Sequence, residues 1–284
     1  LDPAPTADAL LGFNLASDWD EFRAAAEDFA VPAQNLVYAD RTGAIGYQAP
    51  GRIPIRGSGN DGLRPTPGWR PENAWTGEYV PFESLPHELD PEEGFVVTAN
   101  QAATGPDYPV YLTDDWDRGY RAQRIRERLT ALLDDGEVSP EEMAEVQLDV
   151  QHPLAPTLVP YLLDVDLGDG YAAGGQGLLG GWDFSQPAEG PQSAAAAYFS
   201  VTWSRLLELP FHDELEGVAR PDGGDRWMAA VERLLRRPDA SWWDDVGTEE
   251  VERRDDVLRA AMLAARDDLT SLSSPEPEEW EWGQ

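Results

Sequence analysis

The 284-residue sequence contains no cysteine and no lysine. The absence of cysteine excludes disulfides, thiolate nucleophiles and cysteine-ligated zinc, and it leaves the redox compartment open. No apolar run approaches the roughly 20 residues that a membrane-spanning helix needs. All 21 basic residues are arginines, against 54 acidic ones, and the formal net charge is −33. This charge excludes a duplex nucleic-acid binder, which must neutralise phosphates with basic side chains.

The acidic residues are spread along a chain that also carries 11 Trp, 9 Tyr and 8 Phe. With 41% hydrophobic residues, the chain can bury a substantial core, so the charge belongs to a folded protein and not to a disordered tail. A dispersed acidic surface repels itself at low ionic strength and is screened at high salt. We interpret it as the acidic surface of a halophilic protein; an acidic protein with ordinary salt requirements is the alternative.

Hydrophobic periodicity predicts an α+β protein with strands early and helices late. We see no repeat and no clear linker, and we expect one domain over residues 1–284. The expected strands are 35–40 paired with 44–47 as a hairpin, 52–56, and 94–100; the expected helices are 18–29, 117–133, 139–150, 193–209, 225–237 and 248–272. The Gly-rich stretch 174–190 reads as an ordered loop.

The sequence contains no self-contained catalytic motif: it has no GxSxG elbow, HExxH, Walker loop or GxGxxG. The three histidines are scattered, at positions 87, 152 and 212, and we expect them on the surface or at the edge of the core. The acidic pairs Asp114-Asp115 and Asp244-Asp245 could bind calcium through hard oxygens, but most such pairs are solvated surface.

Several ordered blocks resemble the penicillin acylase (penicillin amidase) family of N-terminal-nucleophile hydrolases. They are 32–40, 43–47, 51–54, 75–77, 80–82, 85–86, 94–100, 107–109, 119–125, 147–150, 211–214, 242–245 and 280–283. The set covers nearly the whole chain. The resemblance implies a four-layer αββα sandwich, of which this chain would be a β-chain portion. It also implies removal of an acyl side chain from a β-lactam, an acyl-homoserine lactone or a similar small-molecule amide.

In this family the nucleophile is a serine at the N-terminus of a self-cleaved β-chain, and its α-amino group is the base. The first residue here is Leu1, which has no nucleophilic atom. We therefore expect an internal portion of a longer precursor, inactive by itself, whose partners are the α-chain and the remainder of that precursor. An extracytoplasmic location is implied by the resemblance alone. The alternative is a catalytically dead acidic scaffold that serves as a binding or structural module.

The resemblance assigns two candidate catalytic residues. Asn100 ends the 94–100 block, where the family places an oxyanion-binding carboxamide, and Arg121 opens Arg-Ala-Gln-Arg-Ile and would help to hold the site. Without the resemblance they would read as a turn residue and a surface arginine. Structural calcium is also implied, with Asp107 or Asp114 and the backbone near Gly62 as candidate ligands.

The charge pattern gives a first prediction. The midpoint of thermal unfolding should rise as KCl is increased from about 0.1 to about 2 M, because salt screens repulsion among the carboxylates. A midpoint that falls or stays flat over this range would contradict a salt-adapted surface.

Overall fold

The computed structural model describes residues 4–283, so the expectation about Leu1 lies outside the described residues. The chain divides into two compact units, Leu1–Ala131 and Leu132–Gln284, and the boundary falls within helix α3 (Tyr120–Asp135). The expectation of a single domain stays a prediction.

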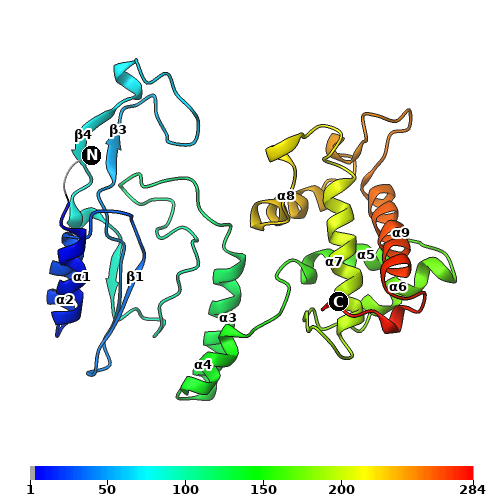
Figure 1. The fold of residues 1–284 in the computed structure, drawn as a ribbon, viewed down its shortest axis with the longest axis horizontal. Helices are drawn as coiled ribbons and strands as arrows, with labels where there is room; N and C mark the ends of the chain where they lie inside the picture. The colour runs from blue at the N-terminus through cyan, green and yellow to red at the C-terminus, as the bar shows by residue number, and fades with distance from the viewer. Residues whose placement is uncertain (1–3, 284) are drawn as a thin grey trace. The chain divides into compact units, whose positions relative to one another are not determined.

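The first unit is organised by an antiparallel sheet with the strand order β1–β2–β5 (Figure 1). The strands are β1 (Leu36–Ala39), β2 (Ile45–Gln48) and β5 (His87–Leu89). Asp40 closes the β1–β2 turn, because its carboxylate accepts the backbone N–H groups of Thr42 at 2.7 Å and Ala44 at 3.2 Å. Gly43 supplies the positive φ of 95° in this turn. The predicted hairpin is confirmed.

Helix α2 (Trp19–Glu27) lies against one face of this sheet, and α1 (Thr6–Leu15) packs on α2. The Asp18 side chain caps α2 by accepting the Glu21 N–H at 2.9 Å. A Cβ on Gly46 would lie 2.6 Å from the Trp19 ring, so the glycine lets helix and strand approach closely. Because side chains alternate along a strand, the Val37–Tyr47–Glu88 row lies on the opposite face.

The predicted strand 94–100 is wrong. Strands require a partner, and among the described residues nothing forms a ladder with this segment. Its backbone is instead held by the side chain of Gln101, which accepts the Ala99 N–H at 2.7 Å and donates to the Val97 carbonyl at 2.8 Å. A side-chain amide thus takes the place of a neighbouring strand. A separate two-stranded sheet pairs β3 (Pro54–Arg56) with β4 (Trp75–Tyr79).

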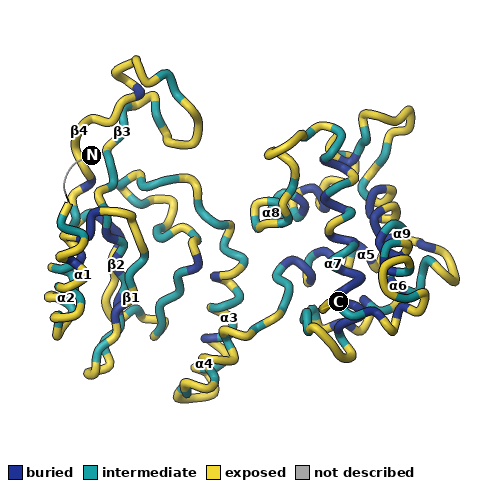
Figure 2. The backbone as a smooth tube through the Cα atoms, viewed as in Figure 1, coloured by how far each residue is buried: buried dark blue, intermediate teal, exposed yellow. Residues whose placement is uncertain are grey.

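The second unit is helical in its described part. Its helices are α4 (Pro140–Gln147), α5 (Ala155–Asp164), α6 (Tyr171–Leu179), α7 (Ser193–Glu208), α8 (Asp225–Leu235) and α9 (Arg254–Leu272). Helix α7 runs through the core of this unit and packs most extensively against α9 (Figure 2). A capping box at Ser139 begins α4. No helix in the described residues is long and apolar enough to cross a membrane.

Helix α6 corrects the expectation of a loop over 174–190. Three glycines lie inside this helix, and Gly175 explains why: a Cβ there would lie 2.5 Å from the buried Tyr198 ring. Close packing of α6 on α7 therefore outweighs the low helix propensity of glycine. Helix α5 was not predicted from the sequence; it carries Pro160 in its interior, a residue that usually ends or kinks a helix.

The α6–α7 contact gives a second prediction. Gly175→Ala should lower the free energy of unfolding, because overpacking of about 1–3 kcal/mol outweighs a helix-propensity gain of about 1 kcal/mol. The Tyr198 ring cannot easily move away from the added methyl group, because its hydroxyl donates to the Met262 carbonyl at 3.1 Å.

The matched control is Gly177→Ala in the same helix, where a Cβ would meet nothing within 4 Å. It should leave stability unchanged or raise it. Urea unfolding of both variants measures the difference, and equal effects would contradict the packing argument.

Candidate functional site

Asn100 is held in an uncommon backbone conformation, with φ at +66°. Asparagine enters this left-handed region more readily than most residues, so the residue type suits the turn. The carbonyl of Asn100 accepts the Asp117 N–H at 3.0 Å. The side chain is therefore carried on a fixed bend at the end of the extended segment 94–99.

Arg121, in the first turn of α3, fixes the carboxamide of Asn100. Its Nη2 donates to Asn100 Oδ1 at 2.8 Å and to the Ala99 carbonyl at 2.9 Å. Because a guanidinium can only donate, the atom of Asn100 that faces it is the amide oxygen. The Nδ2 group is left as a two-hydrogen donor, and among the described residues it has no acceptor.

The structure thus brings together the two candidate catalytic residues predicted from the sequence. It also adds Asp117, whose carboxylate forms an ion pair with Arg121. Sequence reasoning missed this residue. The pattern that could have identified it is an acidic residue four positions before an arginine at the start of a predicted helix.

The Arg121–Asp117 pair contributes little to stability. The side chains of Arg121 and Asp117 are 59% and 36% exposed, and exposed pairs contribute about 0.2–1 kcal/mol. The same Arg121 nitrogen also contacts the Asn100 carboxamide, so the pair lies beside the candidate site.

A cavity of about 340 Å³ lies beside Asn100. Its wall is somewhat more apolar than polar, with Pro50, Ile53, Leu85, Pro86, Leu112 and Trp116 among the lining residues. An apolar group held here would lie next to an oriented amide donor. That combination is typical of small-molecule sites, which pair an apolar wall with a few placed polar groups.

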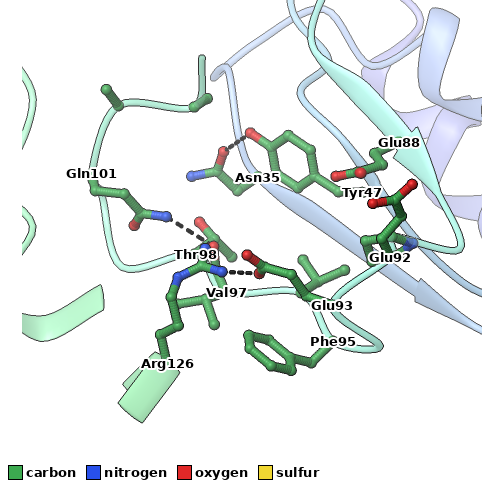
Figure 3. A pocket seen from close by; sticks show the side chains of 14 residues that line it. Asn35, Tyr47, Glu88, Glu92, Glu93, Phe95, Val97, Thr98, Gln101 and Arg126 are labelled. Carbon is green, nitrogen blue, oxygen red and sulfur yellow. Dashed lines mark hydrogen bonds and ion pairs between the residues drawn. The ribbon is translucent and has the colours of Figure 1, made fainter. Parts of the chain in front are cut away.

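A second, more polar cavity of about 450 Å³ shares Asn35, Tyr47 and Ala103 with the first. Figure 3 shows this second cavity, with the Tyr47 hydroxyl pointing to Asn35 and Arg126 paired with Glu93. Tyr47 donates to Asn35 Oδ1 at 2.5 Å. Burial raises the pKa of Tyr47 to about 12, so its hydroxyl keeps its proton near neutral pH.

The calcium candidates do not form a metal site by themselves. Asp107 and Asp114 are both exposed, and among residues 4–283 no three acidic or histidine side chains converge. The Tyr111 hydroxyl does lie between the Asp61 carbonyl, at 2.5 Å, and Asp114 Oδ2, at 3.5 Å. Calcium prefers six to eight oxygen ligands, so these groups do not fit the ion, and we assign no chemical step to a metal.

Of the three histidines, His87 lies in β5 of the first unit, whereas His152 and His212 belong to the second unit. Burial lowers the pKa of His152 to about 4, so its ring is neutral, and it packs edge-on against Phe199 with centroids 4.8 Å apart. Asp213, the sequence neighbour of His212, accepts the Val246 N–H at 2.9 Å.

The amino-acid sequence of the chain matches a known protein family. The penicillin amidase family model matches residues 1–284. Acyl-homoserine lactone acylase QuiP of Pseudomonas fluorescens is 26% identical, over 98% of this chain and 36% of its own length. Penicillin acylase 2 proenzyme of Pseudomonas sp. is 32% identical, over 83% of this chain and 30% of its own length. The chain therefore belongs to the penicillin amidase family.

A solved structure extends the match to the fold. Thermostable penicillin G acylase from Alcaligenes faecalis superimposes with a TM-score of 0.72 at 19% identity, covering 97% of this chain and 53% of that chain. The predicted α+β class and N-terminal-nucleophile hydrolase fold are confirmed. The chain spans about a third of the length of the curated relatives named above.

The backbone of Asn100 gives a third prediction. Asn100→Ala should lower the free energy of unfolding by about 1–2 kcal/mol relative to Asn100→Gly, because a Cβ without a polar group disfavours positive φ. Denaturant unfolding of the two variants measures the difference. Equal stability would show that this bend is not fixed in the folded protein.

Proposed function

We propose that the protein containing this chain is an acylase. It removes the acyl side chain from an amide such as a β-lactam or an acyl-homoserine lactone, through an N-terminal serine that lies outside this chain. The observation that carries the proposal is the Asn100 carboxamide, whose oxygen is engaged by Arg121 while its N–H groups remain to donate. Membership of the penicillin amidase family supports it.

In this mechanism the serine hydroxyl attacks the amide carbonyl, and the α-amino group of the same residue takes its proton. That amine has an ordinary pKa of about 7.7–8.0, which suits a base near neutral pH. Negative charge then develops on the former carbonyl oxygen. Asn100 donates a hydrogen bond to it without adding a charge of its own, and the α-ammonium returns the proton to the departing amine. Water then hydrolyses the acyl-enzyme.

The apolar cavity beside Asn100 is the place we assign to the acyl group. An apolar acyl chain gains about 25 cal/mol for each Å² removed from water, so this cavity favours apolar acyl groups over charged ones. The partners in this proposal are the α-chain and the remainder of the precursor. The relative named as a proenzyme is consistent with that. An extracytoplasmic location stays a prediction.

The proposal is tested by hydrolysis of benzylpenicillin and N-octanoyl-homoserine lactone, with detection of the released amine, in about 2 M KCl. We expect turnover of at least one substrate. Asn100→Ala should lower kcat by about 10²–10³-fold, because one oxyanion donor is removed. Asn100→Gly, which keeps the backbone conformation available, should lose as much.

Asn100→Asp is the variant that tests the hydrogen-bond donor of Asn100 most directly. It keeps the size of the side chain but replaces the donor with a carboxylate that repels the oxyanion, so kcat should fall at least as far. An unchanged kcat in Asn100→Ala would reject the oxyanion role. A protein that binds these amides without hydrolysing them would instead indicate the non-catalytic scaffold.

A further inference from the structure

Asp117 makes contact with both elements of the candidate site. Its backbone N–H donates to the Asn100 carbonyl at 3.0 Å, and its carboxylate pairs with Arg121, four residues later in the chain. Gln101 and Asp117 also form an isolated parallel bridge. The residue therefore joins the bend that carries Asn100 to the helix that carries Arg121.

We propose that Asp117 is a positioning residue for the oxyanion donor, acting through Arg121. This inference rests on the acylase proposal. Three oxygen atoms, from Ala99, Asn100 and Asp117, share the single Nη2 of Arg121. The Asp117 carboxylate selects the rotamer of Arg121 in which that nitrogen reaches the Asn100 carboxamide.

The need for such a constraint follows from the exposure of Arg121. Its side chain is 59% exposed and long, so water competes for every N–H group. In a chain with net charge −33, other carboxylates compete as well. An acid four residues before the arginine, tied by its own backbone to Asn100, gives the guanidinium a fixed local partner.

Charge provides a second reason. An arginine this close to a developing oxyanion would also favour other anions at the site. The Asp117 carboxylate neutralises that charge, so Asn100 is presented as a neutral donor. The pair therefore orients the carboxamide without giving the site a general affinity for anions.

The test compares Asp117→Ala with wild type, using the acyl amides named above. Asp117→Ala should lower kcat by about 10-fold with little change in KM, because a misoriented donor affects the transition state more than substrate binding. Asp117→Asn keeps an acceptor oxygen and should lose less. Unchanged kcat in Asp117→Ala, with wild-type activity present, overturns the inference and leaves the acylase proposal standing.

A double-mutant cycle distinguishes positioning from a general structural effect. If Asp117 acts through Asn100, Asp117→Ala should have no further effect on kcat in an Asn100→Ala background. Additive losses would overturn the inference. The matched control is Glu127→Ala, which removes another ion pair of α3, that between Arg124 and Glu127, and should leave kcat unchanged.

A structural readout is independent of hydrolysis. Crystal structures of wild type and Asp117→Ala should show Arg121 Nη2 within hydrogen-bond distance of Asn100 Oδ1 only in wild type. Retention of that contact in the variant overturns the inference, even if the acylase proposal itself has failed. Absence of turnover in the wild type, by contrast, counts against the acylase proposal alone.

Discussion

The hydrogen bond from Arg121 Nη2 to Asn100 Oδ1 is the interaction on which the site depends. The carboxamide of an asparagine has a donor end and an acceptor end. Because a guanidinium can only donate, Arg121 binds the oxygen of Asn100 and leaves its NH2 group pointing away. The free end of the carboxamide is then a neutral donor beside an apolar cavity. Oxyanion stabilisation requires such a preorganised donor, because its orientation must be set before charge develops.

The first unit supplies what this interaction needs. Helix α2 lies on one face of the sheet with α1 packed on it, and Tyr47 on the other face lines both cavities. The Gln101 side chain fixes the segment before Asn100 by replacing a strand partner. The polar groups that hold the site are mostly exposed, so their contribution is to geometry more than to folding stability.

Features set by local chemistry could be predicted from the sequence. The Asp40–Gly43 turn and the Asp18 and Ser139 caps depend on residues within a few positions of one another. Features set by distant contacts could not. The segment 94–100 has strand composition but no ladder partner, and α6 depends on Tyr198 packing against Gly175. Asn100 and Arg121 were found through family motifs, whereas Asp117 needed the fold to show its contacts.

The central claim is that Asn100 donates to the oxyanion of the reacting amide. The most direct measurement is a crystal structure of the protein with a boronic-acid analogue of the acyl group, which forms a tetrahedral adduct with a serine nucleophile. The account predicts a distance of about 2.7–3.1 Å from Asn100 Nδ2 to one adduct oxygen, with Arg121 still on Oδ1. An adduct whose oxygens are bound by other groups, with Asn100 turned away, would contradict it.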